Sequence, residues 1–360
     1  MSTLVTPTTV ESNAIRPAPR FQYWREVRLA FWSLVALGLV AITLSPWASG
    51  FADDATRQGT DLQLYAAEVE QLRAGGNYYD IAARELPARG FPTRSVFNWR
   101  TPLPFTLIAA VPEPVGRALL LAAALATVWL IVPMWFQHSG WFGLLSGCFF
   151  FWGAAQPIFM DQAWLLPEVW SGMFIALSLS AYARERTKLG IAAGLAALFL
   201  RELAAPYCVL CTIWAMRQRR WNEALCWMIG GSLYLIFYTW HIEQVLWRIT
   251  PEATAHTQSW LAFGGAAFVI SLVQMNVWLL ILPQWVSAIV LTITAKTWSR
   301  PQNDWERRLA MTGAMYLLLF GLIGLPFNQY WGSLLAPLIA VTLGFVQSRS
   351  NPSLPSPSLV

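Results

Sequence analysis

Acidic side chains concentrate in one stretch of this sequence, and they are the groups that could do chemistry. Eight of the nineteen Asp and Glu residues fall between residues 53 and 117. A carboxylate held beside a hydroxyl group can take its proton, and a base positioned in this way typically accelerates a reaction about 10²- to 10⁴-fold. Asp61 is the carboxylate of this stretch considered for catalysis. The alternative for Asp61 is a structural role, because the helix dipole stabilises a carboxylate in the first turn of a helix even when that carboxylate has no part in catalysis.

The segment that carries Asp61 has the pattern of an amphipathic helix. Thr60 can cap it by accepting a hydrogen bond from the amide of Gln63, and the two glycines that follow can end it. A helix is therefore predicted from Asp61 to Ala74. Its apolar stripe consists of Leu62, Tyr65, Val69 and Leu72. Asp61 and Glu68 flank this stripe, so we expect the helix to lie on the membrane surface with its carboxylates at the rim.

The composition of the whole chain indicates a membrane protein. The chain has 360 residues, of which 56% are hydrophobic and 12% are charged, whereas soluble proteins carry roughly a quarter charged residues. This balance excludes disordered, collagen-like and nucleic-acid-binding proteins. The 21 Trp residues suit a bilayer, since their rings collect at the headgroups. We therefore predict an all-α polytopic membrane protein without a nucleic-acid partner.

The distances between charged residues predict about ten apolar helices, because one crossing needs roughly 20 apolar residues. Arginines precede the first interval, residues 29–52, and this basic flank places the N-terminus in the cytoplasm. Residues 53–117 then form the first extracytoplasmic loop, in which residues 101–111 are too short to cross and are expected to be re-entrant or interfacial. The other crossings are expected in residues 118–160 (two, joined near residues 137–140), 168–183, 189–216 (a hairpin with Arg201 near its outer apex), 224–242, 253–295 (one) and 309–348 (two).

A single transmembrane domain, residues 29–348, is therefore predicted. A polar tail with its basic flank, residues 1–28, precedes it, and a Ser/Pro-rich tail, residues 349–360, follows it. Both tails are expected to be disordered and cytoplasmic, in a multi-pass protein of the inner (plasma) membrane. The histidines are expected at the membrane interface: His138, His241 and His256.

Arg201 is the most conspicuous charge within an apolar interval. A guanidinium in such a place is costly unless it is paired or used, so it is a candidate for binding an anion. The alternative is an ion pair with Glu202, although adjacent helical residues point about 100° apart and do not readily pair. Arg100, just above the membrane, is the second candidate for the anion.

Three short stretches carry a resemblance to a known family. They are Gly59-Thr60-Asp61-Leu62-Gln63-Leu64-Tyr65, continuing to Gly75-Gly76-Asn77-Tyr78-Tyr79-Asp80, then Phe97-Asn98-Trp99-Arg100-Thr101-Pro102-Leu103-Pro104, and Gln329-Tyr330-Trp331 through Pro337. Together with the helix count they resemble the GT-C superfamily of polyprenyl-phosphate-sugar-dependent integral membrane glycosyltransferases, which includes mannosyltransferase-like enzymes.

The resemblance implies that a sugar passes from a polyprenyl-phosphate donor to an acceptor hydroxyl on the extracytoplasmic side. The acceptor would be a glycan, a lipid or a protein, and Asp61 would be the general base of an inverting transfer. The departing phosphate needs a cation to stabilise its charge. Members of the superfamily often place an Arg beside the Tyr of the late motif, where this chain has Asn328 and Gln329. Arg201 is therefore expected to bind the phosphate instead. The predicted substrate-binding residues are Tyr65, Asn98, Trp99, Arg100, Asp161, Glu168, Arg201, Glu202, Gln329 and Tyr330.

The cofactor requirement is open, with a divalent cation as one candidate. Asp161 and Glu168 lie seven residues apart and share a helical face if that helix begins early. With Asp61 they could surround a metal ion or hold sugar hydroxyls, and the alternative for Asp161 is a solvated helix end.

Two other functions stay open beside the enzyme. A transporter or lipid flippase is the first, although such proteins tend to show repeated halves, whereas here the polar residues concentrate in one loop near the start. A non-catalytic scaffold with a GT-C-like fold is the second, because the late Arg is missing.

Overall fold

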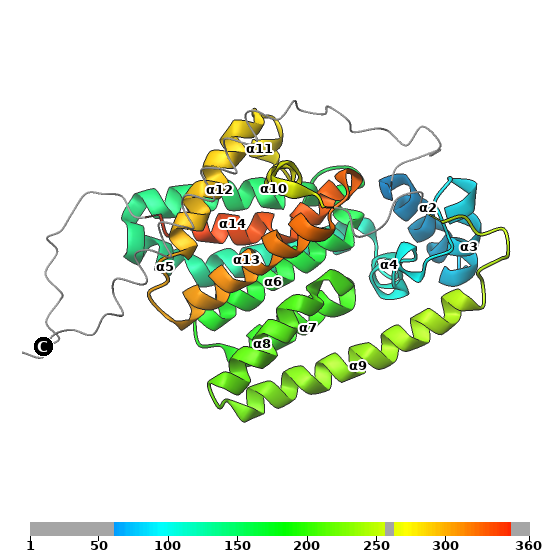
Figure 1. The fold of residues 1–360 in the computed structure, drawn as a ribbon, viewed down its shortest axis with the longest axis horizontal. Helices are drawn as coiled ribbons and strands as arrows, with labels where there is room; N and C mark the ends of the chain where they lie inside the picture. The colour runs from blue at the N-terminus through cyan, green and yellow to red at the C-terminus, as the bar shows by residue number, and fades with distance from the viewer. Residues whose placement is uncertain (1–60, 256–262, 347–360) are drawn as a thin grey trace, which may run out of the picture. The chain divides into compact units, whose positions relative to one another are not determined.

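The computed structural model describes residues 61–255 and 263–346, and every regular element in these residues is a helix (Figure 1). The prediction of an all-α protein is confirmed for this part of the chain. The first expected crossing, residues 29–52, lies outside the described residues, as do Thr60, His256 and both expected tails. The α-helices are α2 (Asp61–Arg73), α3 (Tyr78–Ala88), α4 (Pro102–Ala109), α5 (Glu113–Ala155), α6 (Pro167–Ala183), α7 (Thr187–Leu200), α8 (Ala205–Arg217), α9 (Trp221–Leu246), α10 (Gly265–Val273), α11 (Val277–Leu280), α12 (Gln284–Trp298), α13 (Asp304–Ile323) and α14 (Ala336–Leu343).

Helix α6 lies at the centre of the packing. It contacts α5, α7, α13 and α14, and also η5 (Pro326–Leu334), a 3₁₀ segment. Of its 17 residues, 15 are buried, which is typical of a helix that is apolar on all sides and enclosed by others. Glu168, in its first turn, is therefore held inside the protein.

Helix α5 doubles back at Gly140, whose φ of 59° is in the left-handed region that favours glycine. In a straight helix, Trp135 and Gly147 would lie about 18 Å apart along the axis. A Cβ added at Gly147 would instead lie 2.7 Å from the Trp135 ring, so the two arms of α5 pack against each other. The turn falls within residues 137–140, where the sequence predicts one.

Two helices in the described residues are long and apolar enough to cross a bilayer, so the prediction of about ten is too high for this part of the chain. They are residues 113–158, which include the doubled α5, and α9. The other apolar intervals are divided into shorter helices: residues 189–216 contribute to α7 and α8, on either side of a 3₁₀ turn, Glu202–Ala204. With 14 residues, α7 is about 21 Å long, short of the roughly 30 Å of a hydrocarbon core.

Helices α2, α3 and α4 pack on one another, and we call them the α2–α4 group (Figure 1). Phe105 of α4 is fully buried between two tyrosine rings, 4.9 Å from Tyr65 and 5.9 Å from Tyr78 by ring centroids. Residues 101–111, expected to be re-entrant or interfacial, thus supply the core of this group. The predicted helix from Asp61 is α2, and Gly75, with φ of 88°, follows its end.

The α2–α4 group is joined to the C-terminal end of α9. Tyr79 Oη and His241 Nδ1 lie 3.0 Å apart, and Arg248 Nη2 forms an ion pair with Asp80 Oδ1 at 2.9 Å. His241 is completely buried, so its ring faces the interior of the protein. Its place inside the protein follows from its contact with α3, which lies 162 residues earlier in the sequence.

Candidate functional site

A cleft lies between the α2–α4 group and η5. It contains about 500 Å³ of space outside the protein atoms, its open mouth included. Polar and charged groups from segments far apart in the sequence meet there. Its lining residues are Asp61, Leu64, Tyr65, Glu68, Leu86, Phe91, Pro92, Asn98, Arg100, Phe327, Asn328 and Tyr330.

Arg100 joins the two walls of the cleft. Its Nε donates a hydrogen bond to the Tyr65 hydroxyl at 2.9 Å, and its Nη2 donates to the Tyr330 hydroxyl at 2.8 Å. The Tyr78 hydroxyl donates to the Arg100 carbonyl oxygen at 2.8 Å and fixes the backbone. Burial raises the pKa of Tyr65 well above its usual value, so this phenol stays neutral and accepts from the guanidinium. Arg100 is the cation that lines the cleft.

Asp61 is the first residue of α2, and it lines the same cleft as Arg100. Its charge acts on both tyrosines that hold the guanidinium, Tyr65 and Tyr330. The structure therefore brings the predicted general base and the second candidate cation to one site. A hydroxyl group and an anionic group could meet them there together.

Glu68 is a second carboxyl group of the cleft, seven residues after Asp61 on the same helix. It is 2% exposed, and its Oε2 has no hydrogen-bond partner. Burial raises the pKa of Glu68 to about 8, against the opposing effect of Arg100. The prediction that the carboxylates of this helix lie at the rim is wrong for Glu68, because its face of α2 is turned into the protein. The buried residues of α2 are Leu64, Tyr65, Glu68 and Val69.

Arg201 is buried among carboxylates and does not line the cleft. It is 2% exposed, and its Nε lies 2.6 Å from Oε1 of the fully buried Glu168. Neither atom has a hydrogen-bond partner of acceptable geometry, so this contact is an ion pair without a directed hydrogen bond. Arg201 also pairs with Glu202.

The pair with Glu202 contradicts the expectation that these neighbours point apart. Arg201 is not helical: it follows α7 with φ −155° and ψ 122°. An extended residue directs its side chain differently from a helical one, and the two charges meet. The charge of Arg100 also acts on Arg201, so this buried group lies close behind the cleft.

The acidic residues proposed for a metal ion are not brought together. Helix α6 begins at Pro167, so Asp161 precedes it and does not share a helical face with Glu168. Asp161 is exposed, and its carbonyl oxygen accepts a hydrogen bond from Arg117 Nη2. Across residues 61–255 and 263–346, no group of three or more His, Cys, Asp or Glu side chains could hold a metal ion.

The remaining residues predicted to bind substrate lie in different surroundings. Asn98 lines the cleft and donates to the Pro92 carbonyl oxygen at 2.7 Å. Trp99 is buried, and its Nε1 donates to the Thr93 carbonyl oxygen. Gln329 donates to the Ser271 carbonyl oxygen and does not line the cleft.

Two polar residues of the cleft were not among the predicted site residues, Glu68 and Asn328. The seven-residue spacing from Asp61 to Glu68, about two helical turns, was a sequence signal for the first of them. No sequence signal pointed to Asn328, because the sequence gives no indication that η5 lies beside α2.

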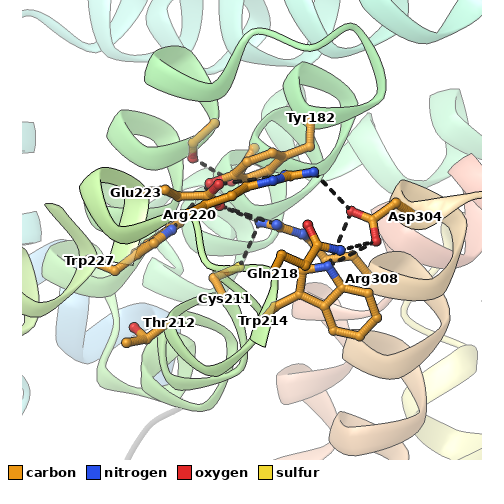
Figure 2. A network of polar contacts seen from close by, with 12 residues as sticks. Tyr182, Cys211, Thr212, Trp214, Gln218, Arg220, Glu223, Trp227, Asp304 and Arg308 are labelled. Carbon is orange, nitrogen blue, oxygen red and sulfur yellow. Dashed lines mark hydrogen bonds and ion pairs between the residues drawn. The ribbon is translucent and has the colours of Figure 1, made fainter. Parts of the chain in front are cut away.

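A second polar network joins α8, α9 and α13 (Figure 2). Arg308, 1% exposed, donates to Glu223 Oε1 at 3.2 Å, and its guanidinium lies 3.8 Å from the ring centroid of Tyr182. Asp304 accepts hydrogen bonds from Trp214 and Gln218 and pairs with Arg220. None of these residues lines the cleft, and the network links α8, α9 and α13 to one another.

Comparisons of the chain with protein-family models, with curated proteins and with solved structures find no match. The chemistry of the cleft is therefore the evidence on function.

Proposed function

We propose that the chain is a membrane glycosyltransferase that moves a sugar from a polyprenyl-phosphate donor to an acceptor hydroxyl. The observation that carries the proposal is the presence of Asp61 and Arg100 in one cleft. Each of the three stretches that resemble the GT-C superfamily contributes to its lining: Tyr65 comes from the first, Asn98 from the second and Tyr330 from the third. A shared site for these stretches is what a common catalytic role requires.

In the proposed reaction, Asp61 takes the proton of the acceptor hydroxyl while that oxygen attacks the anomeric carbon. The bond between this carbon and the phosphate oxygen breaks, and polyprenyl phosphate leaves with the electron pair. The attack comes from the side opposite the phosphate, so the configuration of the sugar inverts. The acceptor is a glycan, a lipid or a protein.

Arg100 is a better contact for the leaving phosphate than Arg201. Arg201 is neutralised by two carboxylates, Glu168 and Glu202. Arg100 is held by neutral phenols, and among the described residues it forms no ion pair with a carboxylate. A cation whose charge is not already balanced by a carboxylate gains more electrostatic binding energy from an anionic ligand. The proposal therefore assigns phosphate to Arg100 and a structural role to Arg201.

The surface of α9 supports a place in a bilayer. Leu233, Leu235 and Ile236 are 55%, 65% and 68% exposed, respectively, which is unfavourable in water and ordinary in lipid. Exposed Trp221 and Trp247 mark the two ends of this helix. Their 26-residue separation corresponds to about 39 Å, close to the roughly 40–45 Å between the two headgroup regions.

The ends of α9 also fit the predicted topology. Its N-terminal end follows a basic cluster, Arg217, Arg219 and Arg220, which is typical of the cytoplasmic side. Its C-terminal end contacts α3 of the loop predicted to be extracytoplasmic. The proposal thus places the cleft on the extracytoplasmic side of the inner (plasma) membrane, with multiple crossings and both termini in the cytoplasm.

Turnover of purified protein tests the proposal. Full-length protein in detergent is given polyprenyl-phosphate mannose or glucose with extracted membrane glycolipid as acceptor, and the release of polyprenyl phosphate is measured. Asp61→Asn should lower turnover about 10²- to 10⁴-fold. Glu70→Gln, an exposed carboxyl change on the same helix, should leave it unchanged.

Equal turnover by wild type and Asp61→Asn would refute the assignment of the base. Movement of the lipid across vesicles without transfer would favour the transporter or flippase. Binding with neither transfer nor movement would favour the non-catalytic scaffold.

A further inference from the structure

Two residues that line the cleft each carry a buried polar atom without a hydrogen-bond partner. These atoms are Glu68 Oε2, on α2, and Asn328 Nδ2, on η5. Their residues are 2% and 1% exposed, respectively. Buried polar atoms are nearly always paired in native proteins, so an unpaired one needs an explanation such as an absent ligand or water. Here both atoms belong to the same cleft, on walls contributed by different elements.

We propose that Glu68 and Asn328 bind two hydroxyl groups of a hexose, so that they select the sugar of the lipid-linked donor. The proposal rests on the proposed glycosyltransferase function and names the part of the cleft that reads the sugar. It separates this role from that of Arg100, which contacts phosphate.

The two atoms have the complementary chemistry that a polyol requires. Asn328 Nδ2 can only donate a hydrogen bond, whereas a carboxyl group that keeps its proton, as Glu68 does up to about pH 8, both donates and accepts. Each sugar hydroxyl also donates and accepts. The charged groups that act on Glu68 are Arg100, Glu85, Arg89 and Asp61.

The rest of the lining fits a sugar ring better than the other parts of the donor. Leu64, Leu86 and Phe91 offer apolar surface to the C–H faces of a ring. A prenyl chain has no group to pair with Glu68 or Asn328. A phosphate has no C–H face to lie against Leu64, Leu86 and Phe91.

Binding by lipids that differ only in the sugar tests the proposal. Full-length protein in detergent is titrated with polyprenyl-phosphate mannose, polyprenyl-phosphate glucose and unglycosylated polyprenyl phosphate of one chain length. Glu68→Met should weaken binding of at least one sugar-bearing lipid about 5- to 100-fold, the usual effect of an unpaired buried polar group. Binding of unglycosylated polyprenyl phosphate should change less than about twofold, well below one hydrogen bond.

Conservative and second-site variants make the test specific. Glu68→Gln keeps a donor and an acceptor and should retain the sugar-dependent part of the affinity. Asn328→Ala should lose the sugar-dependent part of the affinity, as Glu68→Met does. If Glu68→Met does not fold, Asn328→Ala is the variant that tests the proposal. Glu70→Gln is the matched control on the exposed face of α2.

The outcomes that overturn the proposal are distinct. Equal weakening of all three lipids would show a structural role, and unchanged affinities would show that water alone occupies these atoms. If wild type binds and transfers sugar, and Glu68→Met and Asn328→Ala keep the wild-type preference among the three lipids, this inference fails and the proposed function stands. If wild type binds none of the lipids, both fail.

Discussion

Replacing Glu68 by glutamine should make the folded protein increasingly more stable than wild type as the pH rises. The pKa of Glu68 is about 8 in the fold, against the ordinary 4.5, so between these values the folded protein holds a proton that the unfolded chain has released. Wild-type stability therefore falls as the pH rises through this window. The difference between the two values, at 1.36 kcal/mol per unit, gives a full loss of about 5 kcal/mol above pH 8.

The amide of Glu68→Gln does not titrate, so the variant lacks this loss. Arg100, the largest charge acting on Glu68, keeps its charge throughout the window and leaves the sign unchanged. The difference in free energy of unfolding between variant and wild type should be near zero at pH 4.5 and largest near pH 9, where it corresponds to a shift in melting temperature on the order of 10 °C.

Thermal unfolding followed by tryptophan fluorescence, in one detergent from pH 4.5 to pH 9, measures this difference. Glu70→Gln, on the exposed face of α2, should follow the wild-type curve at every pH. A constant difference between Glu68→Gln and wild type across the range would refute the argument, because it would mean that Glu68 ionises normally in the folded protein.

Three further substitutions test the assignments made above. Arg201→Met leaves Glu168 buried without its cation and should lower the free energy of unfolding by about 3–5 kcal/mol, measured by thermal unfolding. Arg100→Lys keeps the charge but not the two hydrogen bonds to tyrosines. It should reduce kcat/KM for the lipid donor about tenfold or more, and lower the melting temperature because the two walls of the cleft lose this link. An unchanged kcat/KM would contradict the phosphate assignment. Gly147→Leu should destabilise the protein by about 1–3 kcal/mol, because a side chain there meets the opposite arm of α5. The control Gly231→Leu has open space around its Cβ position, and equal melting temperatures for the two would contradict the hairpin.

Local signals in the sequence predict local structure here. Capping and apolar spacing predict the helix from Asp61 to Ala74, and α2 spans Asp61–Arg73. The turn within α5 lies in a charge-free interval too long for one crossing, at Gly140. The number of spanning helices was overestimated, because an apolar interval does not reveal where its helix breaks, as at Arg201.

The arrangement of the candidate site depends on contacts between distant residues. Arg100 meets Tyr330 across 230 positions of sequence, and nothing in either local pattern indicates which of two arginines faces the cleft. The burial of Glu68 likewise depends on how α2 packs within the group that includes α3 and α4. The start of α2 at Asp61 was predictable because the chemistry of a helix start is local.

The attachment of α3 to the end of α9 links the cleft to the lipid around it. At about 39 Å for 26 residues, α9 exceeds the roughly 30 Å of hydrocarbon, and a helix of this length accommodates the excess by tilting. In the proposed placement, a change of tilt moves the C-terminal end of α9, and the contacts of Tyr79 and Asp80 with that end carry the α2–α4 group along. Under that placement, the acyl-chain length of the membrane affects the position of the cleft relative to the headgroups.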